Sequence, residues 1–180
     1  PMSIMVAAGR GAQAGVLFKD ATAIERLRDV DTLIVDKTGT LTEGRPAVAS
    51  VRVVAGMTEA RLFSLAASLE RGSEHPVAAA IVSEATARGV DVAEITGFRS
   101  HTGRGVTGTV AGRAVALGNA ALMSELGIPI APLQDEAAAL SGDGQTVMYV
   151  AVDAALVGSI GVADSIKATT REALAQLQAE

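Results

Sequence analysis

Apolar positions divide the chain into a short opening region, a long middle block and a closing helical segment. In the opening region, residues 4–14 follow a weak helical pattern, and Asp20 could cap a short helix over residues 21–28. Residues 32–35 form a short apolar run that is typical of a fully buried strand. The Gly-Arg-Pro sequence at residues 44–46 then breaks the pattern and marks the first expected domain boundary.

The middle block alternates between two periodicities. Runs in which every second residue is apolar predict strands, and runs with apolar residues three or four apart predict amphipathic helices. Thr58 is a candidate N-cap, Pro76 suits the first turn of a helix and Gly89 suits its end. The expected helices cover residues 59–70, 76–88, 120–126 and 133–140, and the expected strands cover residues 47–54, 92–99, 105–111, 113–118, 146–153 and 155–163.

The predicted fold class combines an α+β middle block with pieces of an α/β domain. The strand at residues 32–35 and a closing helix at residues 165–178 cannot make a complete α/β domain, because a parallel sheet needs several strands that are covered on both faces. The middle block is therefore expected to be an insertion into a second domain. The expected divisions are residues 1–28, 29–45, 46–158 and 159–180.

Composition restricts the classes of function. Of the 180 residues, 49% are hydrophobic and only 2% are aromatic, which supports a packed core but no aromatic platform for single-stranded nucleic acid. The formal net charge of −5 leaves no basic surface for a duplex, so no nucleic acid is expected among the partners. Cysteine is absent, which excludes disulfides, thiolate metal sites and Cys nucleophiles within these residues.

The first 20 residues allow two interpretations. No apolar run in the chain reaches the roughly 18 residues of a membrane span. The opening segment is nevertheless apolar and then turns positive at Arg10 and Lys19, as at the cytoplasmic exit of a membrane helix whose apolar part lies upstream. An ordinary N-terminal helix packed on the core explains the same residues equally well.

The sequence D-K-T-G-T-L-T begins at Asp36, directly after the apolar run. In open α/β sheets, ligands bind at the carboxyl ends of the strands. Gly39 permits a sharp turn there, and Lys37 adds a positive charge. Thr38 and Thr40 supply hydroxyl groups, so the turn could bind an anion beside the carboxylate. An Asp that caps an ordinary turn explains a D-x-T match, but it does not explain all seven positions.

The seven-residue sequence closely resembles the phosphorylation signature of the P-type ATPases, which are cation pumps that pass through an aspartyl-phosphate. The resemblance implies that Asp36 is the phosphorylated residue and that the adjacent Lys37 is also catalytic. It implies further that the Asp36 carboxylate and the Thr38 backbone help to hold Mg²⁺. It also implies that Thr38 contacts the phosphate. Phosphatases of the related haloacid dehalogenase superfamily have a second Asp, an acid/base, at the position of Thr38. Because this chain lacks the second Asp, the phosphoenzyme should not be hydrolysed quickly and should persist while a pump changes its conformation.

An ATP-dependent enzyme needs a nucleotide site, and no Walker A sequence is present. Gly103, Gly105 and Gly108 match the spacing G-x-G-x-x-G, but strand-like residues follow them, whereas a dinucleotide-binding fold requires a helix there. We therefore exclude a Rossmann site. Glycines between strands let a backbone approach a ligand closely, although a simple hairpin bend explains them too.

The sequence S-E-H-P at residues 73–76 is a stronger indication. Taken alone, His75 would be interpreted as an exposed residue at the start of a helix. The four residues, however, resemble the sequence that marks the nucleotide-binding domain of heavy-metal P-type ATPases. The glycine pair at residues 103 and 105 and the Gly118-Asn119 pair match that class as well, whereas Thr107 departs from it where some relatives have a third Gly.

The resemblance implies a role for each matching residue. Glu70 would hydrogen-bond the edge of the adenine, and His75 would line or stack on the ring. The two glycines would let the backbone approach the nucleotide, and Asn119 would contact its ribose or phosphate side. The implied nucleotide-binding residues are Glu70, Ser73, His75, Gly103, Gly105 and Asn119.

The resemblance covers essentially the whole chain. Residues 1–27 resemble the segment that leads from the metal-binding membrane helix into the phosphorylation domain, and residues 162–174 resemble the return into that domain. In the return segment, Asp164 and Lys167 match a hinge-like D-x-[IV]-K sequence. The G-D-G at residues 142–144 precedes a strand, so we interpret it as a turn; the late Mg²⁺ motif of these pumps is expected after Glu180.

Among heavy-metal pumps, the chain is most similar to copper(I) exporters. The implied fold is a partial haloacid-dehalogenase-like phosphorylation domain with an inserted nucleotide-binding domain, built on an antiparallel sheet flanked by helices. The chain is expected to bind ATP and Mg²⁺ in the cytosolic part of a membrane protein, with little turnover alone and with Cu⁺ bound elsewhere. Expected partners are the transmembrane helices, the actuator domain, the rest of the phosphorylation domain and a metallochaperone. A soluble phosphatase and a non-catalytic adenine-nucleotide-binding module are the two alternatives.

Overall fold

The computed structural model describes residues 2–27 and 29–179. The chain forms two compact units, of which the first comprises Pro1–Asp36 and the second comprises Lys37–Glu180. This division falls next to the expected phosphorylation residue. The four divisions predicted from the sequence remain predictions.

The first unit contains two helices, α1 (Met2–Gln13) and α2 (Ala21–Leu27). Asp20 caps α2 as the sequence predicted, because its Oδ1 atom accepts a hydrogen bond from the Ala23 N–H group at 2.8 Å. None of the described residues in these two helices is buried. Both helices are therefore held by local interactions and capping more than by a core.

The prediction of a buried strand at residues 32–35 is wrong. These residues have no strand pairing, and Leu33 and Ile34 are 59% and 94% exposed. A buried parallel strand needs neighbouring strands and helices that cover both faces. Within the described residues, the one sheet contains no strand from this segment. The apolar run thus has the composition of a buried strand but lacks neighbouring strands and covering helices among the described residues.

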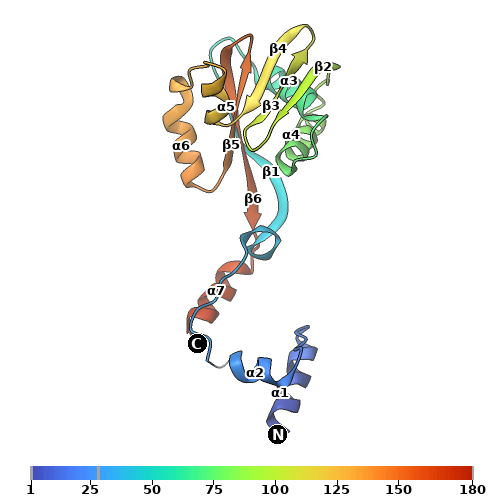
Figure 1. Cartoon of the computed structure of the whole chain (residues 1–180), viewed down its shortest axis with the longest axis vertical. Helices are drawn as coiled ribbons and strands as arrows, with labels where there is room; N and C mark the ends of the chain where they lie inside the picture. The colour runs from blue at the N-terminus through green and yellow to red at the C-terminus, as the bar shows by residue number, and fades with distance from the viewer. Residues whose placement is uncertain (1, 28, 180) are drawn as a thin grey trace. The chain divides into compact units, whose positions relative to one another are not determined.

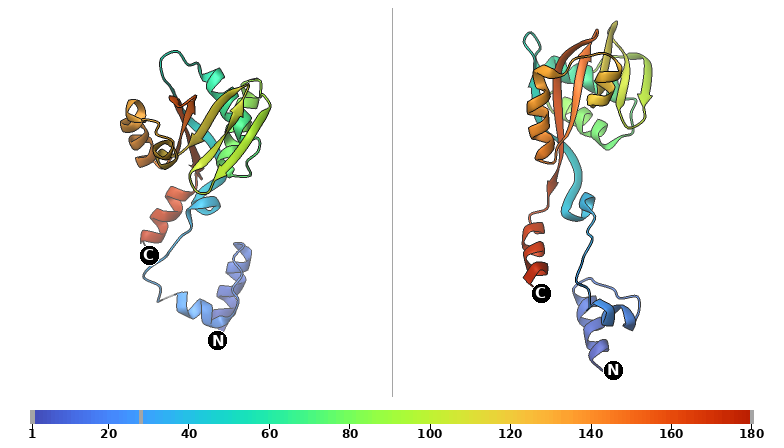
Figure 2. Two further views of the ribbon diagram at one scale, coloured as in Figure 1. Left: turned by 45° about the horizontal axis from the view of Figure 1, so that its top comes forward. Right: turned by 60° about the vertical axis from the view of Figure 1, so that its left-hand side comes forward.

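The second unit is built around a six-stranded antiparallel sheet with the strand order β1-β6-β5-β4-β3-β2 (Figures 1 and 2). Strands that follow each other in the chain pair as antiparallel hairpins in β2–β3, β3–β4 and β5–β6. The strands are β1 (Thr42–Val53), β2 (Ile95–His101), β3 (Gly105–Val110), β4 (Arg113–Gly118), β5 (Thr146–Val152) and β6 (Ala155–Ile166).

Helices pack on both faces of this sheet. The helices of the second unit are α3 (Glu59–Glu70), α4 (Pro76–Ala87), α5 (Ala120–Glu125), the 3₁₀ helix η2 (Ala131–Leu133), α6 (Gln134–Gly142) and α7 (Thr170–Ala179), of which α7 follows the end of β6 and does not cover the sheet (Figure 1). Helices α3 and α4 lie on one face, and α5 and α6 lie on the other (Figure 1). The alternation of the strands creates both cores, since Leu117 of β4 belongs to the same core as Phe63 of α3, while the adjacent Ala116 belongs to the same core as Leu122 of α5.

Strands β1 and β6 extend beyond their predicted limits. The expected break at residues 44–46 lies inside β1, and the closing helix begins at Thr170 rather than at residue 165. Thr42 pairs with Ile166, so residues predicted to be helical continue the ladder instead. The ladder shifts register between Thr42 and Pro46. Because β1 is an edge strand, a proline without an N–H group is tolerated there.

Candidate functional site

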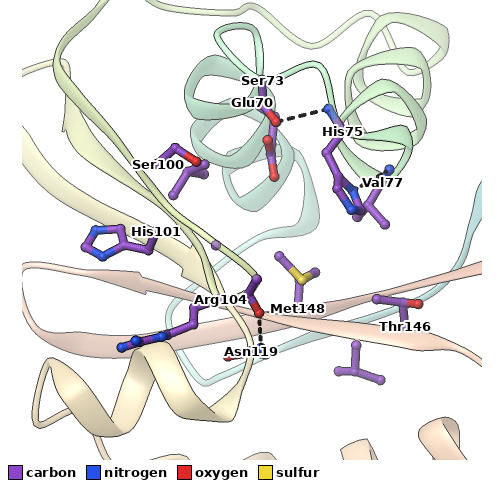
Figure 3. Close-up of a pocket in the computed structure, with 14 residues that line it drawn as sticks. Glu70, Ser73, His75, Val77, Ser100, His101, Arg104, Asn119, Thr146 and Met148 are labelled. Atoms are coloured by element: carbon purple, nitrogen blue, oxygen red, sulfur yellow. Dashed lines mark hydrogen bonds between the residues drawn. The ribbon is translucent and has the colours of Figure 1, made fainter.

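A cleft of about 240 Å³ is formed by the connection between α3 and α4, the turn between β2 and β3, and the start of β5 (Figure 3). Every residue that the sequence predicted to bind nucleotide lines this one cleft. They come from three separate segments of the chain, so only the fold brings them together. These residues are Glu70, Ser73, His75, Gly103, Gly105 and Asn119.

Glu70 is the last residue of α3 and carries a buried carboxyl group in the wall of the cleft. The residue is 4% exposed, and its Oε2 atom has no hydrogen-bond partner among the described residues. Burial raises the pKa of the Glu70 carboxyl, and a hydrogen bond with the Ser73 side chain partly opposes this shift. An unpaired buried acceptor is unfavourable by about 1–3 kcal/mol. Such an acceptor in a cleft is suited to a ligand that brings a hydrogen-bond donor.

His75 caps helix α4 with its own side chain. Its Nδ1 atom accepts a hydrogen bond from the Val77 N–H group at 3.2 Å, and Pro76 occupies the first turn as predicted. The backbone N–H group of His75 donates to Ser73 Oγ at 3.3 Å. An imidazole that accepts at Nδ1 carries its proton on Nε2 when it is neutral. The ring is thus fixed at the helix start, with its Nε2–H edge available to a ligand.

The two glycines of the β2–β3 turn are required for different reasons. Gly103 has φ = +69°, and a Cβ atom added there would meet no atom within 4 Å, so the backbone faces open space. Gly105 has φ = +145°, and a Cβ atom there would overlap the Leu117 carbonyl oxygen of β4. Gly103 therefore leaves room beside the cleft, whereas Gly105 is needed for the close approach of two strands.

Asn119 joins the turn to helix α5. Its Oδ1 atom accepts hydrogen bonds from the N–H groups of Ala121 and Leu122, at 3.1 and 3.2 Å, and so caps the helix. Its Nδ2 atom donates to the Gly103 carbonyl oxygen at 3.0 Å (Figure 3). The side-chain amide is thus used for positioning the glycine turn. A contact between Asn119 and a ribose or phosphate stays a prediction.

Several lining residues were not singled out by the sequence. They are Val77, Ser100, His101, Arg104, Val106, Thr146, Val147 and Met148. Val106 and Met148 could have been inferred from the period-two alternation of their strands, which directs these side chains toward α3 and α4. Thr107, the departure noted above, bonds to the His101 ring at 3.0 Å between Oγ1 and Nε2 and does not line this cleft.

The segment that follows Asp36 forms a tight turn, Lys37–Leu41, in which Gly39 has φ = +77°. Two residues of the return segment, which follow the end of β6, hold this turn. Lys167 Nζ donates to the Gly39 carbonyl oxygen at 2.7 Å, and Thr170 Oγ1 donates to the Leu41 carbonyl oxygen at 2.7 Å. The hinge-like sequence recognised at Asp164 and Lys167 therefore contacts the turn directly.

Asp164 connects the return segment to the start of β1. Its Oδ2 atom lies 2.5 Å from the Thr42 hydroxyl group, which donates to it, and its Oδ1 atom accepts from the Arg45 N–H group at 3.0 Å. The Gly44 N–H group also donates to Oδ2, at 3.2 Å. The hydrogen bond from Thr42, followed by those from the backbone and the charge of Lys37, lowers the pKa of the Asp164 carboxyl.

Asp36, Lys37 and Thr38 are all exposed. A carboxylate on the surface can be reached by a phosphoryl donor, which a carboxylate sealed in the core could not. Within residues 2–27 and 29–179, no group of three or more His, Cys, Asp or Glu side chains is arranged to hold a metal ion. The Mg²⁺ ligands Asp36 and Thr38 accordingly stay a prediction. None of the described helices combines the length and the apolar content needed to cross a bilayer.

Comparisons with known proteins agree with this geometry. The haloacid dehalogenase-like hydrolase family matches residues 30–180. A copper-transporting P-type ATPase of Rhizobium leguminosarum bv. viciae is 58% identical over 98% of this chain, and a copper-exporting P-type ATPase of Legionella pneumophila is 49% identical over 99%. A silver exporting P-type ATPase of Salmonella typhimurium is 46% identical over 99%. The chain spans between 21 and 24% of the length of these relatives.

Solved structures show the same relationship. A zinc-transporting PIB-type ATPase in its E2.Pi state matches 98% of this chain, over 28% of its own length, at 32% identity and a TM-score of 0.78. The N-domain of HMA8, a copper-transporting P-type ATPase, matches 65% of this chain over 99% of its own length, at 28% identity and a TM-score of 0.56. The chain therefore belongs to the haloacid dehalogenase-like hydrolases, and its similar relatives include copper- and silver-exporting P-type ATPases.

Proposed function

We propose that this chain is the ATP-binding and phosphorylation region of a copper(I)-exporting P-type ATPase. The observation that carries the proposal is the convergence of all the predicted nucleotide-binding residues on one cleft, with an unpaired buried acceptor in its wall. The match to an isolated N-domain over about two thirds of the chain supports the proposal that residues 46–158 are an inserted nucleotide-binding domain. Copper is the transported substrate and would be bound elsewhere in the pump.

In the proposed binding mode, the Glu70 oxygen without a partner accepts a hydrogen bond from the exocyclic amino group of adenine. Such a bond removes the unfavourable burial of that atom, which gives the site a physical preference for a base with a donor at this edge. The His75 ring, fixed by its bond to Val77, packs beside the base. The space next to Gly103 accommodates the sugar and phosphates.

The proposed phosphoryl acceptor is Asp36. Its carboxylate oxygen attacks the γ-phosphorus of ATP, the bond from that phosphorus to the β–γ bridging oxygen breaks, and ADP leaves. Mg²⁺, for which the Asp36 carboxylate and the Thr38 carbonyl are suitable hard oxygen ligands, would neutralise phosphate charge. Lys37 supplies a further positive charge, and Thr38 contacts the transferred group. The bonds from Lys167 and Thr170 keep the turn that carries these residues in one shape.

The rest of the pump and a metallochaperone are the proposed macromolecular partners, and the proposed location is the cytosolic side of a membrane. We expect the chain alone to bind ATP with little turnover. A stable phosphoenzyme, rather than rapid hydrolysis, follows from Thr38 in place of an acid/base Asp. Rapid hydrolysis of small phosphate esters by the chain would instead favour the phosphatase alternative.

Calorimetric titration of the 180-residue chain with ATP tests the proposal. Wild-type protein should bind, and His75→Gln should weaken binding at least severalfold because it removes the ring from the cleft. Glu94→Gln, which changes a carboxylate outside the cleft, should leave the affinity unchanged. Absence of ATP binding by the wild type, or equal losses in both variants, would contradict the proposed nucleotide site.

A further inference from the structure

The cleft has few charged side chains for a site that is proposed to bind a polyphosphate. Among the described residues that line it, Glu70 and Arg104 have the side chains with a formal charge, and the two histidines have no fixed charge. The whole chain has a formal net charge of −5. A nucleotide triphosphate brings several negative charges, which both Glu70 and the overall charge repel. Among the described residues that line the cleft, Arg104 is the one whose side chain has a permanent positive charge, and this charge can offset the repulsion of the phosphates.

The backbone of Arg104 is fixed at the lip of the cleft, between the two glycines of the β2–β3 turn. Its N–H group donates to the His101 carbonyl oxygen at 2.8 Å, and its carbonyl oxygen accepts from the Asn119 N–H group at 2.8 Å. The Asn119 side chain also holds the neighbouring Gly103 carbonyl oxygen, at 3.0 Å. The point from which the arginine side chain starts is therefore well defined, although the residue belongs to a turn.

The arginine side chain itself is held loosely. Its Nη1 atom pairs with Oε2 of Glu125 on α5, and the two side chains are 52% and 44% exposed. In Figure 3 the Arg104 side chain extends away from His75. Exposed ion pairs contribute about 0.2–1 kcal/mol, so a polyphosphate of higher charge can displace the single carboxylate of Glu125. Arginine also presents paired donors that match phosphate oxygens.

We propose that Arg104 binds the phosphates of the nucleotide and that Glu125 competes with them for its guanidinium group. This inference rests on the proposed nucleotide site and adds to it a residue that distinguishes nucleotides with phosphates from the bare nucleoside. Glu70 and His75 then recognise the base, and Arg104 recognises the charge. Glu125 lowers the affinity by holding the cation in its resting position.

NMR titration of the full chain with adenosine, ADP and ATP tests this assignment, because it measures dissociation constants up to the millimolar range. Arg104→Gln should weaken ADP and ATP binding about three- to tenfold and leave adenosine binding unchanged. Glu125→Gln should strengthen ATP binding by about two- to fivefold. Arg113→Gln is a matched control, since Arg113 pairs with Asp153 at 2.9 Å, is similarly exposed and lies outside the cleft.

The outcomes separate this inference from the proposed function. If wild-type protein binds ATP but Arg104→Gln binds it equally well, or loses adenosine to the same extent, Arg104 is not a phosphate-binding residue and the nucleotide site still stands. A decrease in ATP affinity on Glu125→Gln would also overturn the competition. If the wild type binds neither adenosine nor ATP, both the inference and the proposed site are wrong. Unchanged amide spectra outside the turn show that each variant is folded.

Discussion

Replacing Glu70 by methionine should change stability and nucleotide binding in opposite directions. Glu70 is 4% exposed, and the Oε2 atom of its carboxyl group has no partner in the described part of the chain, so this group destabilises the free protein. Methionine has a similar length and is compatible with a cleft that is also lined by the apolar residues Val77 and Met148. Removing an unpaired acceptor should stabilise the chain by about 1–2 kcal/mol after the loss of the Ser73 hydrogen bond, or about 2–8 °C in Tm.

The pH dependence identifies the carboxylate as the cause. Burial raises the folded-state pKa of Glu70 above its ordinary value of 4.5, so the folded protein holds a proton that the unfolded chain releases. The folded state therefore loses stability as pH rises from about that ordinary value through the raised folded-state pKa. The gain from Glu70→Met should be small at pH 4 and reach its full size once the wild-type carboxyl is ionised.

Thermal unfolding followed by circular dichroism at pH 4 and pH 8 measures this difference, and calorimetry measures ATP binding by the same samples. We expect binding to weaken about 10- to 100-fold, because a hydrogen bond to a charged acceptor is lost. Ser64→Ala, in the same helix but outside the cleft, is a control for general effects on α3. A variant that is less stable than the wild type by the same amount at both pH values would refute the reasoning.

Two further predictions concern the turns. Gly105→Ala should lower the free energy of unfolding by about 2–4 kcal/mol, because the added Cβ atom would overlap the Leu117 carbonyl oxygen. Gly103→Ala should lower it by only about 1–2 kcal/mol, because alanine is strained in the left-handed backbone conformation but meets no other atom there. Equal losses of the two variants in urea unfolding would contradict this distinction. Thr42→Val should return the lowered pKa of Asp164 toward its ordinary value, so that less stability is lost as pH falls below about 3.8, and an unchanged carboxyl titration by NMR would count against it.

The residues proposed to bind nucleotide could be picked out from short sequences, but their meeting in one cleft could not be derived from local patterns. Glu70 and His75 are close in the chain, whereas Asn119 reaches them only through the pairing of β3 with β4. The family resemblance implied a role for Gly103 and Gly105 but none for the arginine between them. Because an exposed arginine in a turn is the ordinary expectation, only the cleft itself gives Arg104 a role.

The two wrong predictions of local structure, at residues 44–46 and 32–35, have one physical cause. In each case, the presence or absence of hydrogen bonds from distant residues decided whether a strand formed. Gly44 and its neighbours have the composition of a break, yet β1 continues through them because Asp164, about 120 positions away, accepts their N–H groups. The run at residues 32–35 has the composition of a buried strand, yet it is exposed where no described strand pairs with it. Local propensity is a weak guide wherever long-range hydrogen bonding decides the backbone.

In the proposed nucleotide site, the two charged residues of the cleft would divide recognition between them in a way that follows from their burial. Glu70 is fixed in the wall, so its selectivity for a donor is present before the ligand arrives and lowers the stability of the free protein. Arg104 is exposed and paired with Glu125, so it can reorient toward phosphates at little cost to the fold. Variants should divide accordingly: changes at Glu70 should alter unfolding and binding together, with opposite signs, whereas changes at Arg104 should alter binding while the unfolding transition stays where it is.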